Sequence, residues 1–396
     1  MPELAINGGK PVRHSLLPYG RQLVDEQDIQ AVERVLRSDW LTTGPQVALF
    51  EEAFATRVKA RYAVAVNSGT AALHAIMAAL GIAAGDEVIV PAITFAASAN
   101  CVVYQGGRPV FVDVEPDTLL IDAGQVESKL TARTRAIVAV DYAGQACAYA
   151  ELESIARQRG VALVADACHA LGGSYHGRPV GALADLSAFS LHPVKPITAG
   201  EGGVVTTDDG RWAARMRAFR NHGITRDHRE RETQGTWYYE MVELGYNYRL
   251  TDLQCALALS QLQKLPGWVA RRQSIARQYT SAFADLPQLQ PLATRPGVSH
   301  AYHLYVVQLD LAQLRVDRAQ VFTALRAEGI GVNVHYLPVY LHPFYRQQFG
   351  TAPGLCPTAE AAYARILSLP IFPAMSDADV CDVIEAVRKV IKAYTR

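Results

Sequence analysis

Between residues 62 and 207 the sequence alternates short runs of β-branched and apolar residues with longer segments of helical character. Nearly continuous apolar strands between helices indicate a largely parallel sheet that is covered on both faces. The sequence therefore predicts the α/β class, with a large domain built on a mostly parallel seven-stranded sheet. The predicted strands span residues 62–66, 87–90, 109–112, 136–140, 161–165, 186–190 and 203–206. Ligands of such sheets bind beyond the carboxyl ends of the strands, so polar residues at these ends are the functional candidates.

The rest of the chain predicts an N-terminal arm and a smaller C-terminal α+β domain. Asp25 can cap a helix whose apolar face comprises Ile29, Val32, Val35 and Leu36. Thr251 and Gln254 form a capping box, and the Lys-Leu-Pro-Gly sequence at 264–267 predicts a break. We expect a large domain at 1–265 and a small domain at 266–396. The predicted elements of the small domain are helices near 268–285 and 317–328, strands near 302–309 and 331–335, and a helix from about residue 376.

The charge balance excludes the simplest nucleic-acid function. The 396 residues contain 38 basic and 38 acidic side chains, whereas binding to a phosphate backbone requires a basic excess or stripe. Half of the residues are hydrophobic, which suffices for a sizeable core and favours a small-molecule site. The N-terminal sequence lacks the apolar core of a secretory signal, and no stretch predicts a membrane span. The six cysteines show no zinc-binding spacing and predict buried thiols in a reducing cytoplasm.

A strand-to-helix turn with small residues follows the first predicted strand. Asn-Ser-Gly-Thr at 67–70 places Gly69 and Thr70 at the start of a helix, where free backbone N–H groups and a hydroxyl can hold an anion. The turn predicts a phosphate site. An ordinary strand-to-helix turn is the alternative, and the motif taken alone favours that alternative.

An acidic residue and a histidine follow the fifth predicted strand. A carboxylate at the end of a buried strand requires a cationic or hydrogen-bonding partner, so Asp166 is a candidate functional acid. His169 would lie on the same side if a turn or helix begins there. The alternatives are a helix cap for Asp166 and a satisfied core histidine for His169.

Lys195 is the one lysine between Lys129 and Lys264. It lies between two prolines, shortly after the predicted strand that ends at Ser190, and a Gly-rich segment follows. A partly desolvated lysine has a lowered pKa, and its free amine forms a Schiff base with an aldehyde. A surface loop lysine is the alternative.

Together these three elements match the needs of pyridoxal 5′-phosphate. This cofactor requires an anion site for its phosphate, a lysine for its aldehyde and a carboxylate that keeps its pyridine nitrogen protonated. Phe95 follows another predicted strand and is placed to stack on the ring, although core packing explains it equally well.

The motifs resemble those of the DegT/DnrJ/EryC1/StrS sugar aminotransferases, which belong to the fold type I pyridoxal phosphate enzymes. The resemblance runs from near residue 20 to the end, and the matching stretches are 41–45, 67–70, 166–172, 190–195, 200–203, 220–223 and 245–252. Segments 140–144, 192–198 and 334–340 look most similar to the members that act in pseudaminic acid biosynthesis. Many other family members carry His-Leu-Tyr-Gly where this chain has Asp-Tyr-Ala-Gly at 141–144.

The resemblance implies a role for each matching residue. Lys195 would hold the cofactor and move the proton, Asp166 would pair with the pyridine nitrogen, and His169 would lie near the ring. The phosphate would be bound by Gly69, Thr70, Ser190 and, from the neighbouring subunit of a homodimer, Asn247. His335 and the aromatic residues before Asn247 are candidate contacts of the nucleotide sugar, and Arg249 is a candidate for the donor carboxylate.

The stretch at 222–248 contains many charges together with Trp237, Tyr238, Tyr239, Tyr246 and Tyr248. It predicts an interface or a lid, although a surface loop with a few aromatic anchors is nearly as good an interpretation.

The implied reaction transfers an amino group from glutamate to the 4-keto position of a UDP-linked 4-keto-6-deoxy-N-acetylhexosamine, with pyridoxamine phosphate as the intermediate form of the cofactor. The alternatives are an aminotransferase for another nucleotide-linked keto sugar, a related sugar dehydratase, and a non-catalytic regulator on the same scaffold. The dehydratases resemble this chain but have histidine in place of the lysine, so Lys195 argues against them.

Overall fold

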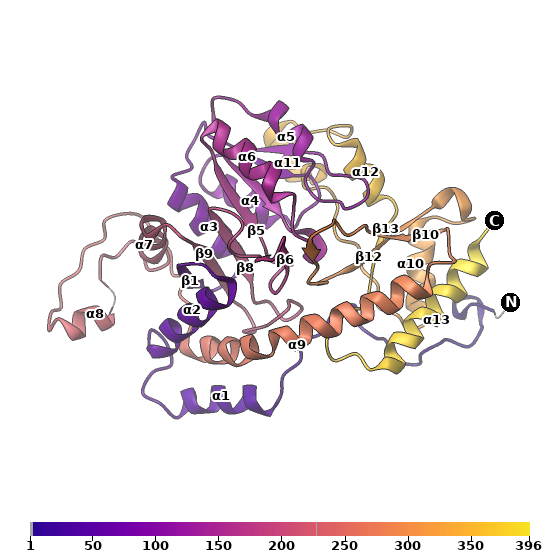
Figure 1. The fold of residues 1–396 in the computed structure, drawn as a ribbon, viewed down its shortest axis with the longest axis horizontal. Coiled ribbons are helices and arrows are strands. Elements are labelled where there is room, and N and C mark those ends of the chain that lie inside the picture. Colours follow the sequence, from indigo (N-terminus) through magenta and orange to yellow (C-terminus); the bar gives the residue numbers. More distant parts are fainter. Residues whose placement is uncertain (1–2, 227) are drawn as a thin grey trace.

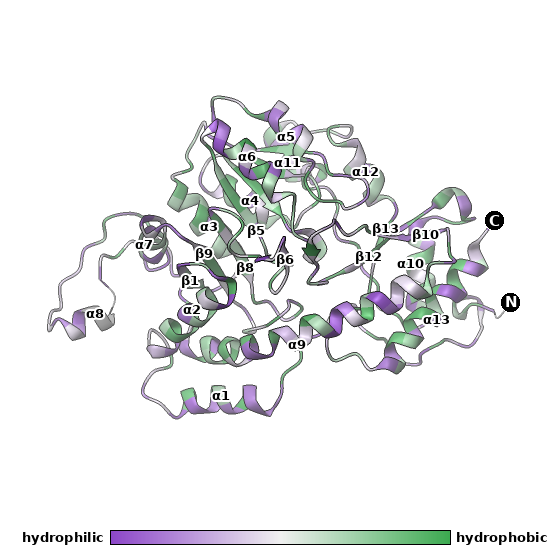
Figure 2. Ribbon diagram, in the orientation of Figure 1, coloured by the Kyte–Doolittle hydropathy of each residue, from purple (hydrophilic) through white to green (hydrophobic). Residues whose placement is uncertain are grey.

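The computed structural model describes residues 3–226 and 228–396, which form two packed parts joined by one long helix (Figure 1). The larger part contains a seven-stranded sheet of order β1-β9-β8-β5-β4-β2-β3. Its strands are β1 (Tyr62–Val66), β2 (Glu87–Pro91), β3 (Arg108–Val112), β4 (Thr134–Val140), β5 (Ala162–Asp166), β8 (Leu186–Ser190) and β9 (Gly203–Thr207). All seven predicted strands are confirmed, and the strands are hydrophobic along most of their length (Figure 2).

The direction of the strands brings the predicted polar residues to one edge of the sheet. Strands β8, β5, β4, β2 and β3 pair in parallel, whereas β9 is antiparallel to both β8 and β1. Asp166 and Ser190 are the last residues of β5 and β8, and Asn67 follows β1. The mostly parallel sheet is therefore confirmed, and it sets these residues side by side.

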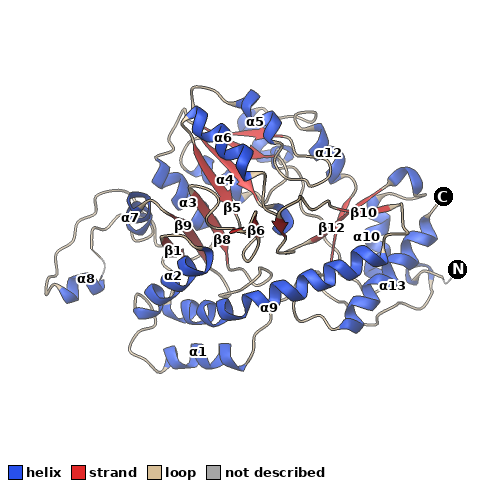
Figure 3. Ribbon diagram, in the orientation of Figure 1, coloured by secondary structure: helices blue, strands red, loops and turns tan. Residues whose placement is uncertain are grey.

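Helices surround this sheet and connect its strands (Figure 3). Those of the larger part are α2 (Pro45–Val58), α3 (Gly69–Leu80), α4 (Ala97–Tyr104), α5 (Ala123–Lys129), α6 (Tyr149–Arg159) and α7 (Gly210–Phe219). Helix α3 is nearly all buried because alanine and larger apolar residues occupy all its sides, and it packs against α4 and α7.

Helix α9 (Asp252–Ala282) is the element that sequence reasoning divided incorrectly. The capping box of Thr251 and Gln254 is confirmed at its start, but the predicted break at 264–267 is wrong, because the helix continues through Pro266. Leu262, Leu265 and Val269 are buried at helical spacing on both sides of the proline. Burial of these three side chains in the core of the larger part outweighs the hydrogen bond that the proline cannot donate. The division of the chain at residue 265 remains a prediction.

The smaller part contains a three-stranded sheet covered by helices. The strand order is β10 (Leu289–Pro291), β12 (Tyr305–Leu309) and β13 (Ile366–Leu369), and all pairs are antiparallel. Helices α10 (Arg318–Ala327) and α13 (Asp377–Tyr394) confirm two predictions in this part, whereas α11 (Pro343–Phe349) and α12 (Pro357–Tyr363) pack against the core of the larger part (Figure 1). The predicted strand at 331–335 is wrong: only Asn333 makes an isolated bridge there, to Ser368. A second small sheet, between the two parts, has the order β11 (Val298–Ser299), β6 (Ser174–Tyr175) and β7 (Arg178–Pro179), so β6 pairs with both of the others.

Helix α1 (Glu26–Leu36) begins at the predicted cap Asp25 but buries a different face from the predicted one. Ile29 and Leu36 are exposed, whereas Asp28, Ala31 and Val35 are buried. The Asp28 carboxylate accepts hydrogen bonds from α9: from Ser260 Oγ at 2.6 Å, Gln261 Nε2 at 2.7 Å and Lys264 Nζ at 2.7 Å. A buried polar cluster therefore orients this helix, and two of its apolar residues face outward.

The stretch at 222–248 projects away from the larger part as an arm with the short helix α8 (His228–Thr233) at its tip (Figure 1). Residue 227 lies outside the described residues. Several large apolar side chains of the arm are exposed, namely Trp237, Tyr238, Tyr239, Met241, Val242, Leu244 and Tyr246.

Among residues 3–226 and 228–396, no helix is both long enough and apolar enough to cross a lipid bilayer. Cys101, Cys147, Cys255 and Cys356 are buried as predicted, whereas Cys381 is exposed and Cys168 is half-buried.

Candidate active site

A cavity of about 890 Å³ lies at the carboxyl ends of the strands. It is lined by most of the predicted site residues, which are Gly69, Thr70, Phe95, Asp166, His169, Ser190, Lys195 and His335. Tyr19 near the N-terminus, together with His303 and residues 333–336 of the smaller part, closes the other side. The fold therefore brings side chains from both parts of the molecule to one site.

The turn before α3 has the form of an anion cradle. Ser68 caps the helix, because its Oγ accepts the N–H of Ala71 at 3.0 Å. The N–H groups of Gly69 and Thr70 have no acceptor within the described chain. A Cβ atom at Gly69 would lie 2.8 Å from the Cβ atom of Ser190, so a larger residue would close the cradle. The cap also suits an ordinary strand-to-helix turn, and phosphate binding remains a prediction.

Asp166 is buried and has the partner that its position requires. Its Oδ2 accepts a hydrogen bond from Ser98 Oγ at 2.6 Å, and its Oδ1 accepts one from the N–H of Cys168 at 3.3 Å. Ser98 Oγ also lies 2.6 Å from Thr94 Oγ1. Asp166 does not cap a helix, because residues 167–172 form turns and open structure. The hydrogen bonds fix the carboxylate at the cavity wall.

Lys195 lies in the turn that follows β8, where its N–H donates to the carbonyl of His192 at 2.9 Å. The side chain lines the cavity and is half-buried. Burial lowers the pKa of Lys195 below its usual range, although the nearby Cys168 and Asp166 act in the opposite direction. The residue is therefore no ordinary surface lysine.

Three buried histidines, His169, His303 and His335, line the cavity. His169 Nε2 lies 3.3 Å from Tyr336 Oη, and the ring centres of His169 and His303 are 4.4 Å apart. His335 Nδ1 lies 2.8 Å from Ser368 Oγ. Burial lowers the pKa of His169 and His303, and it lowers the pKa of His335 to about 3, so all three rings are neutral near pH 7.

The side chain of Phe95 is not part of the hydrophobic core. Its side chain is 58% exposed and lines the cavity, and its ring centre lies 6.0 Å from that of Tyr336. This position favours contact with a ligand, rather than packing in the core, as the role of Phe95.

Two predicted site residues, Asn247 and Arg249, lie outside the cavity. Asn247 is exposed at the base of the arm, where its carbonyl accepts a hydrogen bond from Asn67 Nδ2 at 3.3 Å. Arg249 Nη1 donates to Asn221 Oδ1 at 2.5 Å. Arg249 lines a separate hollow of about 430 Å³, together with Arg226, Arg231 and the aromatic residues Trp40 and Tyr239.

The sequence matches the model of the DegT/DnrJ/EryC1/StrS aminotransferase family over residues 22–388. This chain belongs to that family. It is similar to the spore coat polysaccharide biosynthesis protein SpsC of Bacillus subtilis, with 42% identity over 382 residues that cover 96% of this chain and 98% of SpsC. An uncharacterised protein of Methanocaldococcus jannaschii is 42% identical over 96% of this chain and 99% of its own length.

Solved structures of family members have the same α/β fold. One of them is the putative sugar aminotransferase Spr1654 of Streptococcus pneumoniae in its PMP form. It superposes on this chain with a TM-score of 0.90 at 32% identity, and the match covers 95% of this chain and 99% of Spr1654. PseC of Helicobacter pylori, an aminotransferase of pseudaminic acid biosynthesis, gives a TM-score of 0.90 at 32% identity, covering 96% and 100%. The two values are alike, so the comparisons favour the aminotransferase family without selecting the pseudaminic acid subgroup.

Several residues of this aminotransferase's cavity escaped the sequence analysis. Four lining residues were not predicted as site residues, namely Glu201, Gln254, His303 and Tyr336. Ser98 was not predicted either; it does not line the cavity but donates a hydrogen bond to Asp166, which does. Ser98 lies in the first turn of α4 (Ala97–Tyr104), four residues after Thr94, which precedes the helix. No local pattern marks His303 or Tyr336, because they reach the cavity from the distant smaller part.

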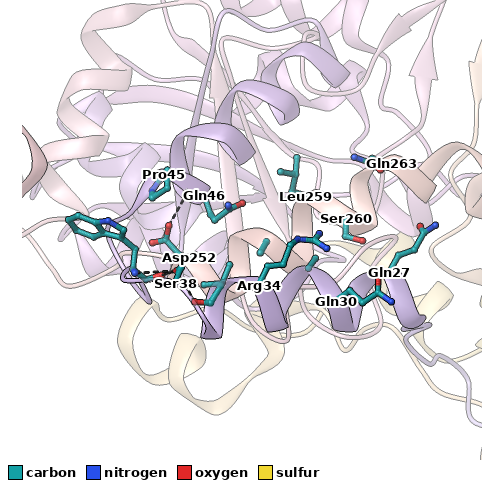
Figure 4. Close-up of a pocket in the computed structure, with 14 residues that line it drawn as sticks. Gln27, Gln30, Arg34, Ser38, Pro45, Gln46, Asp252, Leu259, Ser260 and Gln263 are labelled. Atoms are coloured by element: carbon teal, nitrogen blue, oxygen red, sulfur yellow. Dashed lines mark hydrogen bonds between the residues drawn. The ribbon is translucent and has the colours of Figure 1, made fainter.

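A second hollow, of about 480 Å³, lies between α1 and α9 (Figure 4). Amide and hydroxyl side chains line it, with Arg34 on one side and Asp252 on the other. Asp252 is already bonded to the N–H groups of Gly44 and Gln46, at 2.7 and 2.9 Å. This hollow contains none of the predicted site residues.

Proposed function

We propose that this aminotransferase moves an amino group from glutamate to the 4-keto position of a UDP-linked 4-keto-6-deoxy-N-acetylhexosamine. Family membership and the resemblance to SpsC and PseC support a substrate from sugar or polysaccharide biosynthesis. The observation on which the proposal rests is the meeting of Lys195, Asp166 and the Gly69–Thr70 turn in a single cavity. Each supplies a different group that a pyridoxal enzyme requires.

The cofactor is pyridoxal 5′-phosphate, which pneumococcal Spr1654 holds in one of its solved forms. The residues of this cavity fit it. Two free N–H groups and Ser190 suit the phosphate, the anchored carboxylate of Asp166 suits a protonated pyridine nitrogen, and Lys195 suits the aldehyde. When bound, the cofactor supplies an electron-poor ring that delocalises the electron pair left when a proton leaves the neighbouring carbon.

Lys195 serves as the general base and acid in this proposal. Burial lowers the pKa of this amine, so Nζ is unprotonated over a wider pH range than the amine of a surface lysine and is suited to accept a proton. The same Nζ then returns the proton to the other carbon of the transfer. Its position in the turn after β8 keeps it at the cavity wall throughout.

Asp166 and its partners keep the opposite end of the cofactor charged. The carboxylate is fixed by Ser98 and by the N–H of Cys168, so it needs no rearrangement to face a pyridinium N–H. The neutral imidazole of His169 beside it adds hydrogen bonding without competing positive charge. Phe95, which is exposed to the cavity, is placed for contact with the ring or the sugar.

The substrate's diphosphate requires cations that this cavity lacks. Among the described residues that line it, Lys195 is the one lysine or arginine. Arg226, Arg231 and Arg249 instead line the separate hollow that includes Trp40 and Tyr239. We infer a homodimer in which the arm of each subunit completes the cavity of its partner, with Asn247 at the phosphate and the arginines near the nucleotide. The exposed apolar side chains of the arm support burial against a second copy.

The decisive test is a product analysis. The protein is incubated with glutamate and a panel of UDP- and dTDP-linked 4-keto-6-deoxy sugars, and products are detected by mass. We expect an aminated UDP-linked N-acetyl sugar together with 2-oxoglutarate. Amination of a dTDP sugar alone would favour an aminotransferase for another nucleotide-linked keto sugar. Loss of a hydroxyl group from the sugar without amination would favour a dehydratase. A colourless protein that shows no turnover would favour a regulator.

A further inference from the structure

His74 lies outside the cavity, one turn into helix α3 from the phosphate turn, and contacts the base of the arm. It is buried, with only 2% of its surface exposed. Its ring centre lies between 5.1 and 5.9 Å from the ring centres of Tyr104, Phe219, Tyr246 and Tyr248. Two of these four rings, Tyr246 and Tyr248, belong to the arm and flank Asn247 in the sequence.

The hydrogen bonds of His74 define which nitrogen donates. Gln105 Nε2 lies 2.8 Å from His74 Nε2, and His74 Nδ1 lies 3.1 Å from Tyr248 Oη. Because an amide nitrogen can only donate, His74 Nε2 accepts and the Nδ1–H group donates to Tyr248. Burial lowers the pKa of His74 to about 4, which keeps the ring in this neutral form near pH 7.

Tyr248 and Asn247 are also bonded to the phosphate turn of their own chain. The N–H of Asn67 donates to the carbonyl of Tyr248 at 2.8 Å, and Asn67 Nδ2 donates to the carbonyl of Asn247 at 3.3 Å. The rings of Tyr246 and Tyr248 stack with centres 5.0 Å apart. Residues before and within α3 therefore hold the backbone carbonyls of Asn247 and Tyr248 and contact the aromatic rings on both sides of Asn247.

We propose that His74 is a positioning residue that fixes Asn247 through Tyr248, so that α3 orients both its own phosphate turn and the arm that completes the partner's cavity. The proposal rests on the proposed dimer, in which Asn247 of the partner subunit contacts the cofactor phosphate. In that arrangement a change at His74 weakens cofactor binding in the other subunit and leaves the phosphate turn of its own chain intact.

The first experiment measures binding of pyridoxal 5′-phosphate to apoenzyme variants, by quenching of intrinsic fluorescence. We expect His74→Leu to weaken binding about tenfold, the size of effect of one lost buried hydrogen bond. Tyr248→Phe, which keeps the ring, has a similar effect, whereas His74→Asn retains an N–H donor near the Nδ1 position and restores most of the affinity. Met77→Ala, at a fully buried position of the same helix, controls for general loosening of α3.

The second experiment tests whether the effect crosses the subunit boundary. Chains carrying His74→Leu are mixed with chains carrying Lys195→Ala under conditions that exchange subunits. The mixed dimer contains one site with an intact Lys195 and an intact arm from the partner, so we expect that site to bind cofactor with wild-type affinity and to regain turnover.

Three results would contradict these assignments in different ways. If His74→Leu binds the cofactor with wild-type affinity while Asn247→Ala binds it more weakly, the role of His74 is overturned and the proposed dimeric site stands. Wild-type affinity in Asn247→Ala overturns the proposed dimeric site. Weak binding in His74→Leu that mixed dimers do not restore shows that the residue acts within its own chain, which overturns the positioning role across subunits.

Discussion

Lys195 is the residue on which the proposed reaction depends most, because every proton transfer involves its amine. Lys195→Ala is expected to abolish turnover and the visible absorption of the bound cofactor while the fold is kept. Activity and absorption spectra, with circular dichroism for the fold, check this. Lys392→Ala, at an exposed lysine on α13, is the matched control and is expected to behave as wild type. Turnover that survives Lys195→Ala would refute the assignment.

Ser98 tests whether the orientation of Asp166 matters. Removal of its hydroxyl by Ser98→Ala leaves one side of a buried carboxylate without its hydrogen bond at 2.6 Å. A hydrogen bond to a charged group contributes about 1.5–3 kcal/mol, so we expect cofactor binding to weaken roughly tenfold or more. Thr94→Val, which removes only the neighbouring hydroxyl, serves as control and should change the dissociation constant less. Equal constants for wild type and Ser98→Ala would show that Ser98 has no such role.

At the scale of elements, the sequence predicted what depends on local pattern. The seven strands of the large sheet are confirmed because each is a run of buried, largely apolar residues. The predicted break at Pro266 is wrong because the proline signal is local, whereas burial of Leu262, Leu265 and Val269 in the core of the larger part decides the outcome. That spacing was present in the sequence and was the signal to follow.

The same distinction applies to the candidate site. Asp166, Ser190 and the Gly69 turn were predictable because parallel strands place their carboxyl ends together. His303 and Tyr336 were not, because only the packing of the smaller part brings them to the cavity. The outward-facing Ile29 of α1 was misplaced for a related reason: a buried carboxylate, Asp28, orients that helix.

Helix α1 provides a test of this buried polar contact. Asp28→Ala leaves Ser260 and Gln261 without an acceptor and separates Lys264 from its buried partner. Loss of one partner from a buried charge pair costs about 3–5 kcal/mol. Because Lys264 keeps its ion pair with Asp25, we expect the free energy of unfolding to fall by an amount near the lower value.

Urea unfolding measures this loss, with Glu26→Ala as the control for a lost acidic charge in the same helical turn. A stability of Asp28→Ala equal to that of Glu26→Ala would show that the buried cluster does not stabilise the helix.

At the scale of the whole molecule, buried histidines make stability depend on pH. Burial lowers the pKa of His74 to about 4 and the pKa of His300 and His335 to about 3, against an ordinary value of 6.5. The unfolded chain therefore binds protons that the folded chain does not, and stability falls as pH decreases below about 6.5. Each such histidine removes about 1.4 kcal/mol of unfolding free energy per pH unit. Asp141 acts in the opposite direction, because burial raises its pKa to about 7.

The expected result is a steep fall of the urea midpoint between pH 6.5 and pH 5, where histidines outnumber the one opposing carboxyl. In the wild-type protein the N–H of Tyr302 donates to His300 Nδ1 at 2.8 Å. His300→Asn keeps an acceptor for this N–H group and removes one titrating group. Its stability should therefore lose about 1.4 kcal/mol less per pH unit than wild type. The control is Gln273→Ala, whose amide donates to the carbonyl of His300 and does not titrate. Parallel pH curves for wild type and His300→Asn would mean that His300 is protonated in the folded protein, and the account of the buried histidines would have to be abandoned.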